Sequence, residues 1–169
     1  MTKKIAVLGA GANGASIGAD VTRAGHDVVL IDQWPEHVQA MRQGGVRIEM
    51  PGEVIEQKVR AYNLCDVCTF TEQFDIVLLV MKAYDTKWAT QLIEPYLKSD
   101  GLVAGVQNGM TVDDIADVVI DQNARLIAEQ SVMQLLGSIA APTPFLPRTH
   151  IEPRLIFKEN IPAQALQAG

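Results

Sequence analysis

The sequence predicts an α/β fold with a doubly wound, mainly parallel sheet and helices on both of its faces. Three observations carry this prediction. Short apolar runs typical of buried parallel strands recur along the chain, and segments with helical spacing separate them. A glycine-rich segment, residues 9–14, joins the first strand to the first helix. The order strand, helix, strand, helix favours right-handed crossovers within one sheet.

The first two strand–helix units are well marked. The apolar run at residues 5–8 predicts the first strand, and apolar and small residues at helical spacing predict a helix over 13–24. Residues 27–31 predict the second strand. The helix after it begins at Pro35 and ends at Gly44-Gly45, in keeping with proline near helix starts and glycine near helix ends.

Further strands are predicted beyond the second helix. Residues 46–62 read as shorter, alternating strands around a turn at Pro51-Gly52. Residues 74–81 hold five consecutive aliphatic residues and predict a buried central strand. Residues 102–106 and 125–128 are two further strand candidates.

Two later helices are also predicted. Asp85 or Thr86 can cap the first of them, and Pro95 is expected to kink or split it. Thr111 and Asp114 form a pair like a capping box, which predicts a second helix that includes residues 118–119.

Composition excludes several classes of protein. The chain has 169 residues, is 48% hydrophobic and carries a net charge of -6, so a disordered chain and a duplex nucleic-acid binder are both disfavoured. It has no stretch of 18 apolar residues, so no membrane span is expected. Two cysteines are too few for a disulfide scaffold, which favours a cytoplasmic protein.

The chain is predicted to divide near residue 138. Residues 1–138 would form a dinucleotide-binding domain. Residues 139–169 hold five of the eight prolines and show no clear helical or strand period, so they are expected to be an extended tail or a truncated continuation.

The glycine-rich segment carries the clearest chemical signal. Gly9-Ala10-Gly11-Ala12-Asn13-Gly14 matches G-x-G-x-x-G, the fingerprint of the Rossmann fold. Gly9 would make the tight turn, Gly11 would let a pyrophosphate approach the backbone, and Gly14 would let the helix pack closely. The N–H groups at the helix start would then hold the phosphates. The alternative is a tight strand-to-helix turn that binds no ligand.

Asp32 is the candidate for recognition of the ribose. It follows Gly14 by 18 residues and ends the second strand, close to the spacing of about 20 expected for the ribose-binding acid. A carboxylate there accepts hydrogen bonds from ribose hydroxyls and repels a 2′-phosphate, which favours NAD over NADP. Two alternatives stay open: Arg42 could turn toward a 2′-phosphate, or Asp32 could be a solvated strand end.

Two polar residues follow adjacent predicted strands. Lys82 comes after the strand at 74–81 and could bind a substrate carboxylate or polarise a carbonyl. Asn108 ends the next strand and suits a nicotinamide carboxamide or a substrate hydroxyl. Lys82 could also be a surface lysine, and Asn108 a turn residue before Gly109.

No metal site is predicted. Cys65 and Cys68 have C-x-x-C spacing, but no second pair and no histidine accompany them, so they are interpreted as ordinary cysteines. His26, His37 and His150 are expected to have no catalytic part, His37 because it lies on a polar helix face.

Three motifs together resemble the ketopantoate reductase (2-dehydropantoate 2-reductase) family. They are the glycine motif at 9–14, Lys82-Ala83-Tyr84-Asp85-Thr86, and Gln107-Asn108-Gly109-Met110. The resemblance covers about residues 3–130. It implies an oxidoreductase of pantothenate biosynthesis that delivers a hydride from NAD or NADP to the keto group of ketopantoate or a similar 2-keto acid. By the resemblance, Lys82 and Asn108 would lie near the nicotinamide and the substrate.

Two departures from the family pattern modify these expectations. Family members usually carry a basic residue just after the second strand, where this chain has Asp32-Gln33-Trp34, so NADP preference is in doubt. The family also has a C-terminal helical domain that supplies the catalytic lysine and much of the dimer contact, and that domain is expected to be absent here. The chain would then bind its cofactor with little or no turnover alone, and a homodimer is left open.

Two other hypotheses remain at this stage. One is a regulatory nucleotide-binding module of the potassium-transport type, which uses the same glycine turn and strand-end acid. The other is a non-functional remnant with a folded core. Lys82 together with Asn108 favours the reductase hypothesis, because a sensor needs neither residue for hydride chemistry.

Overall fold

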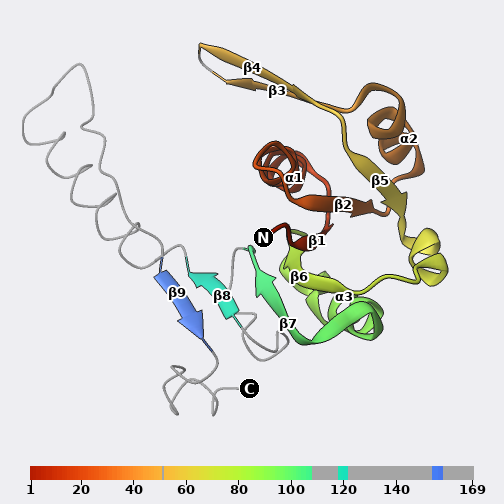
Figure 1. The fold of residues 1–169 in the computed structure, drawn as a ribbon, viewed down its shortest axis with the longest axis vertical. Coiled ribbons are helices and arrows are strands. Elements are labelled where there is room, and N and C mark those ends of the chain that lie inside the picture. Colours follow the sequence, from red (N-terminus) through yellow and green to blue (C-terminus); the bar gives the residue numbers. More distant parts are fainter. Residues whose placement is uncertain (51, 108–117, 122–153, 158–169) are drawn as a thin grey trace, which may run out of the picture.

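The computed structural model describes residues 1–50, 52–107, 118–121 and 154–157. Its main sheet has seven strands in the order β5-β2-β1-β6-β7-β8-β9. Each neighbouring pair is parallel except β8 with β9 (Figure 1). The predicted α/β class with a doubly wound, mainly parallel sheet is confirmed.

The elements follow the predicted order as far as residue 105. The main-sheet strands are β1 (Lys4–Leu8), β2 (Asp27–Asp32), β5 (Arg60–Asn63), β6 (Phe74–Leu79), β7 (Leu97–Gly105), β8 (Val118–Asp121) and β9 (Arg154–Phe157). A separate hairpin consists of β3 (Val46–Met50) and β4 (Glu53–Gln57). The helices are α1 (Ala12–Arg23), α2 (Pro35–Gly44) and α3 (Thr86–Ile93), with 3₁₀ turns η1 (Leu64–Thr69), η2 (Ala83–Asp85) and η3 (Glu94–Tyr96).

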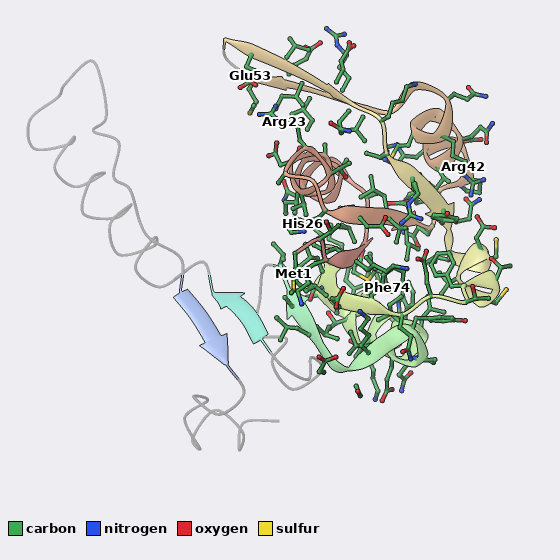
Figure 2. All side chains as sticks on the ribbon, viewed as in Figure 1. Met1, Arg23, His26, Arg42, Glu53 and Phe74 are labelled. Atoms are coloured by element: carbon green, nitrogen blue, oxygen red, sulfur yellow. The ribbon has the colours of Figure 1, made fainter. Side chains whose placement is uncertain are left out.

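The core has two parts, one on each face of the sheet. Along β1, Ile5 and Val7 pack under α1 and α2, whereas Ala6 and Leu8 belong to the cluster under η1 and α3. Phe74 of β6, labelled in Figure 2, belongs to this second cluster. Side chains alternate along a strand, so a strand covered on both faces must be apolar throughout. This is why the run at 5–8 predicts β1.

The hairpin of β3 and β4 stands away from the main sheet, and Figure 1 shows it projecting past α1. It contains the strands predicted around the turn at residues 51–52. Arg23 at the end of α1 pairs with Glu53 across 3.4 Å, which joins the hairpin to the domain (Figure 2). Both side chains are exposed, so this ion pair adds little to stability.

Pro95 divides the helix after β6 as predicted. α3 ends at Ile93 and continues as the 3₁₀ turn η3, which contains Pro95. Asp85 occupies the N-cap position, but its side chain does not cap the helix. Its carboxylate instead accepts a hydrogen bond from the indole N–H of Trp88 at 2.8 Å.

One expectation for the later part of the chain is wrong. Val118 and Val119 lie in β8 and not in a helix, and they pair with Ala104 and Gly105 of β7. Adjacent β-branched residues favour a strand, and this preference outweighs the capping-box signal. β9 lies within the proline-rich segment, residues 139–169.

β9 pairs antiparallel with β8 over four residues. Its apolar residues 155–157 are a local signal for a strand, and the prediction for the proline-rich segment did not include it. The strand candidate at 125–128 lies outside the described residues. The division of the chain at residue 138 stays a prediction.

Asp75 links the amino ends of β1, β6 and β7, which lie at the opposite end of the strands from the glycine motif. Its carboxylate accepts hydrogen bonds from the Lys98 ammonium and from the backbone N–H of Lys4, both at 2.8 Å. The ammonium of Lys3 lies 3.8 Å from the same carboxylate. The bond from Lys98, the backbone bond from Lys4 and the two lysine charges lower the pKa of Asp75 to about 2.

This lowered pKa predicts an acid-sensitive contribution to stability. The folded-state pKa lies below the ordinary value of 3.8, so the contribution is present above about pH 4 and disappears as pH falls toward 2. We expect Asp75→Asn to lower the melting temperature at pH 7 and to melt close to wild type at pH 2. The exposed Asp20→Asn variant is the control. An equal difference between Asp75→Asn and wild type at both pH values would contradict this assignment.

Candidate nucleotide-binding site

A cavity of about 500 Å³ lies at the carboxyl ends of the central strands. Its lining comes from the segments that follow β1, β2, β5, β6 and β7: Gly9, Gly11, Asn13, Asp32, Gln33, Trp34, His37, Leu64, Lys82, Tyr84, Trp88, Gln107 and neighbouring residues. In open α/β sheets, ligands bind in the crevice outside these strand ends. The volume is within the range of small-molecule sites.

The glycine loop is tightly folded between β1 and α1. Gly9 has a φ of +92°, and its N–H donates to the carbonyl of Ile31 at 2.9 Å. A Cβ on Gly9 would lie 2.9 Å from backbone atoms of Val80 and Met81. Glycine is therefore required here both by the backbone conformation and by the neighbouring strand end.

Gly14 allows α1 to approach this turn. A Cβ on Gly14 would stand 1.9 Å from the backbone oxygen of Gly9, which is far inside any contact distance. Gly14 itself does not line the cavity. Its part is to hold the helix N-terminus against the loop.

Gly11 differs from both of these glycines. Its φ of −62° and ψ of −170° are open to other residues. A Cβ built on Gly11 would meet no atom within 4 Å. No packing around Gly11 calls for glycine, yet the residue lines the cavity. The backbone at Gly11 is thus left bare on the side where a ligand could approach.

Asp32 is buried at the end of β2, with 6% of its surface exposed. Oδ2 accepts the N–H of Ala10 at 2.7 Å, and Oδ1 accepts the N–H of Trp34 at 3.0 Å. This buried, bonded carboxylate disagrees with the alternative that Asp32 is a solvated strand end. Each carboxylate oxygen has a second lone pair, so the group can still accept from a ligand hydroxyl.

Arg42 does not face the cavity. Its Nε donates to the carbonyl of Ala61, and its guanidinium bonds the carboxylate of Asp66, both at 2.7 Å. A backbone hydrogen bond from Asn63 and the bond from Arg42 lower the pKa of Asp66, so this partner stays ionised. The alternative in which Arg42 binds a 2′-phosphate would require this arrangement to break.

Lys82 lies exposed on the cavity wall, just after β6. Within the described ranges of the chain, its ammonium has no ion-pair partner. Two hydrogen bonds support the loop that carries Lys82. The hydroxyl of Thr86 donates to the side-chain oxygen of Gln107 at 2.8 Å, and the side-chain amide of Gln107 donates to the backbone carbonyl of Lys82 at 3.4 Å. Asn108, the second predicted residue, lies outside the described residues.

Several lining residues were missed by the sequence reasoning. Trp34 and Tyr84 line the cavity while 64% and 81% of their surfaces are exposed. His37, expected to have no part, has Nε2 2.7 Å from the carbonyl oxygen of Ala10. The aromatic residues could have been found from their position directly after a strand, but the His37 contact joins residues 27 positions apart and has no local signal.

Cys65 and Cys68 are both exposed on η1 and are not bonded to each other in a disulfide. In the described part of the chain, no three metal-binding side chains gather into a group. Nor does any helix among the same residues reach the length and hydrophobicity needed to cross a bilayer.

The fold and this site define a Rossmann-type domain, with its crevice at the glycine motif. Residues 5–134 match the family model described as ketopantoate reductase PanE/ApbA. The chain belongs to this family of oxidoreductases, as its three motifs predicted.

Known proteins show the same likeness. A 2-dehydropantoate 2-reductase from Lactococcus lactis subsp. lactis (strain IL1403) is 30% identical over 120 residues, which cover 71% of this chain and 38% of the relative. A solved PanE/ApbA family ketopantoate reductase from Ralstonia eutropha JMP134 superposes with a TM-score of 0.57 at 38% identity, covering 66% of this chain and 35% of that one.

A third similar protein was solved with a bound cofactor. D-mandelate dehydrogenase, solved with NADH and anilino(oxo)acetate, superposes with a TM-score of 0.61 at 29% identity, over 69% of this chain and 39% of that one. The chain thus spans less than half the length of these relatives. The matches support the reductase hypothesis and give no support to the regulatory module of the potassium-transport type.

Proposed function

We propose that the chain binds a nicotinamide dinucleotide in the cavity at the glycine motif, and NAD(H) in preference to NADP(H). The observation that carries the proposal is Gly11, which lines the cavity and is glycine although no packing contact among the described residues requires it there. A pyrophosphate that touches the backbone would need it. The N-terminus of α1 adds a favourable field for the phosphates.

The donor set also fits the ribose next to this pyrophosphate. Asp32 borders the cavity with lone pairs for hydroxyl groups. Its negative charge would repel a 2′-phosphate, and the neighbouring Gln33 and Trp34 bring no compensating cation. Arg42, the other candidate partner for a 2′-phosphate, is bonded to Asp66. These contacts favour NAD(H).

The preference predicts a measurable ratio of affinities. In fluorescence titrations, we expect NADH to bind wild type roughly tenfold or more tightly than NADPH, about 1.4 kcal/mol. Gln33→Arg, at an exposed position on the cavity wall, should tighten NADPH binding severalfold by adding a cation beside the 2′-phosphate, with NADH little changed. Gln39→Arg on the exposed face of α2 is the control. Tighter binding of NADPH by wild type would contradict the proposal.

We further propose that the site belongs to a reductase of 2-keto acids, with ketopantoate as the first candidate and pantothenate biosynthesis as the pathway. The cofactor, when bound in reduced form, would supply the hydride for a carbonyl carbon, and the reaction would also need a proton for the carbonyl oxygen. The exposed ammonium of Lys82 could hold the carboxylate of such a substrate or polarise its carbonyl. Asn108 is proposed as its partner at the next strand end.

By the family resemblance, the catalytic lysine belongs to the helical domain, so these residues alone are expected to bind the cofactor with little or no turnover. A homodimer is the assembly that the resemblance suggests.

A further inference from the structure

The imidazole of His37 joins two loops at the mouth of the cavity. His37 lies in the first turn of α2, and its Nε2 is 2.7 Å from the carbonyl oxygen of Ala10 in the glycine loop. A carbonyl oxygen can only accept, so Nε2 carries the proton and donates. The segment after β2 thereby holds the segment after β1.

Ala10 is held from both sides. Its N–H donates to Asp32 at 2.7 Å, and its carbonyl accepts from His37 at the same distance. Its side chain is fully buried in the cluster under α1 and α2. The peptide units on either side of Ala10 are thus both fixed, one by Asp32 at the end of β2 and the other by His37 beyond it.

The second of these peptide units contains the N–H of Gly11. No cis peptide is present in the described chain, and in a trans peptide the carbonyl and the next N–H point in opposite directions. Fixing the carbonyl of Ala10 on His37 therefore fixes the direction of the Gly11 N–H. Among the described residues, this N–H has no acceptor, and it belongs to the residue whose open face lines the cavity.

We infer that His37 is a positioning residue for the dinucleotide, which orients the Gly11 peptide toward the pyrophosphate by holding the carbonyl of Ala10. The inference rests on the proposed function, since it requires a phosphate-bearing ligand at the glycine loop. His37 itself is exposed on the cavity wall, and the contact that carries its positioning part is the hydrogen bond to Ala10. Its loss should therefore change ligand binding more than folding.

The test separates a ligand with phosphates from one without. Kd values are measured for ADP-ribose and for adenosine, which lacks the pyrophosphate. We expect His37→Ala to weaken ADP-ribose binding roughly tenfold and adenosine binding less than about twofold, since the affected N–H meets the charged phosphates. His37→Gln, whose amide can still donate to Ala10, should recover most of the affinity. His26→Ala is the matched control, because His26 bonds Lys3 and does not line the cavity.

A second readout needs no ligand. In amide NMR spectra, the Gly11 resonance should shift in His37→Ala and return toward its wild-type position in His37→Gln. Equal weakening of both ligands, unchanged binding of ADP-ribose, or an unmoved Gly11 resonance would overturn the inference. If wild type bound no ADP-ribose, the proposed function would fail as well. If wild type binds it and His37→Ala binds equally, only the inference fails.

Discussion

Replacing Gly11 with alanine is expected to weaken dinucleotide binding by at least about tenfold, or about 1.4 kcal/mol, while the fold stays intact. The added methyl group would stand in open space beside the cavity, where it would meet no described residue other than its chain neighbours within 4 Å. A pyrophosphate resting on this backbone would be pushed away. The measurement is the Kd for NADH by calorimetric titration.

The same substitution is expected to leave the stability of the fold almost unchanged. The backbone angles of Gly11 suit alanine, so the free energy of unfolding should change by less than about 1 kcal/mol. Gly44→Ala is a matched control, because a Cβ on Gly44 also meets nothing and lies away from the cavity. Unchanged NADH affinity in Gly11→Ala would contradict the assigned use of this glycine, as would a large loss of stability.

Gly14→Ala is expected to have the opposite profile, with a large loss of stability. Its Cβ would lie 1.9 Å from the backbone oxygen of Gly9 and 3.0 Å from the carbon of the same carbonyl. Neither atom can swing aside as a side chain could, so α1 must move off the loop. Overpacking of this kind should cost about 3 kcal/mol or more.

Gly18→Ala in the same helix provides the comparison for Gly14→Ala. A Cβ there would meet the terminal Cδ2 of Leu30 at 2.2 Å, and this flexible side chain can rotate. The better helix propensity of alanine offsets part of the cost, so the loss should be about 1 kcal/mol. Denaturant unfolding of both variants is the measurement. Equal losses, or a stable Gly14→Ala variant, would contradict the close approach at Gly9.

Local patterns in the sequence were enough to predict much of this fold. The central strands β1 and β6 are covered on both faces, so after Lys4 in β1 and Asp75 in β6 their sequences are apolar. Gly9 and Gly14 could be assigned their steric parts from spacing alone, and Asp32 its place at the end of β2. These features depend on residues close together in the chain or on the glycine motif, whose spacing is characteristic.

Features that depend on distant partners were not predictable in the same way. The pairing of β9 with β8 joins residues far apart in the chain, and the contact of His37 with Ala10 exists only once β1 and β2 lie side by side. The misassigned residues at 118–119 illustrate competing local signals, since a capping-box pattern precedes two β-branched residues. The sequence could place Lys82 at a strand end, but not the support that Gln107 gives its loop.

Binding of a nicotinamide dinucleotide at the glycine motif is tested most directly by titration of NADH into the isotope-labelled chain, followed by amide NMR. We expect saturable shifts with one common Kd at Gly9, Gly11, Asp32, Trp34 and Lys82, which surround the cavity. An unchanged spectrum at millimolar NADH, or shifts confined to residues elsewhere such as the β3–β4 hairpin, would contradict it.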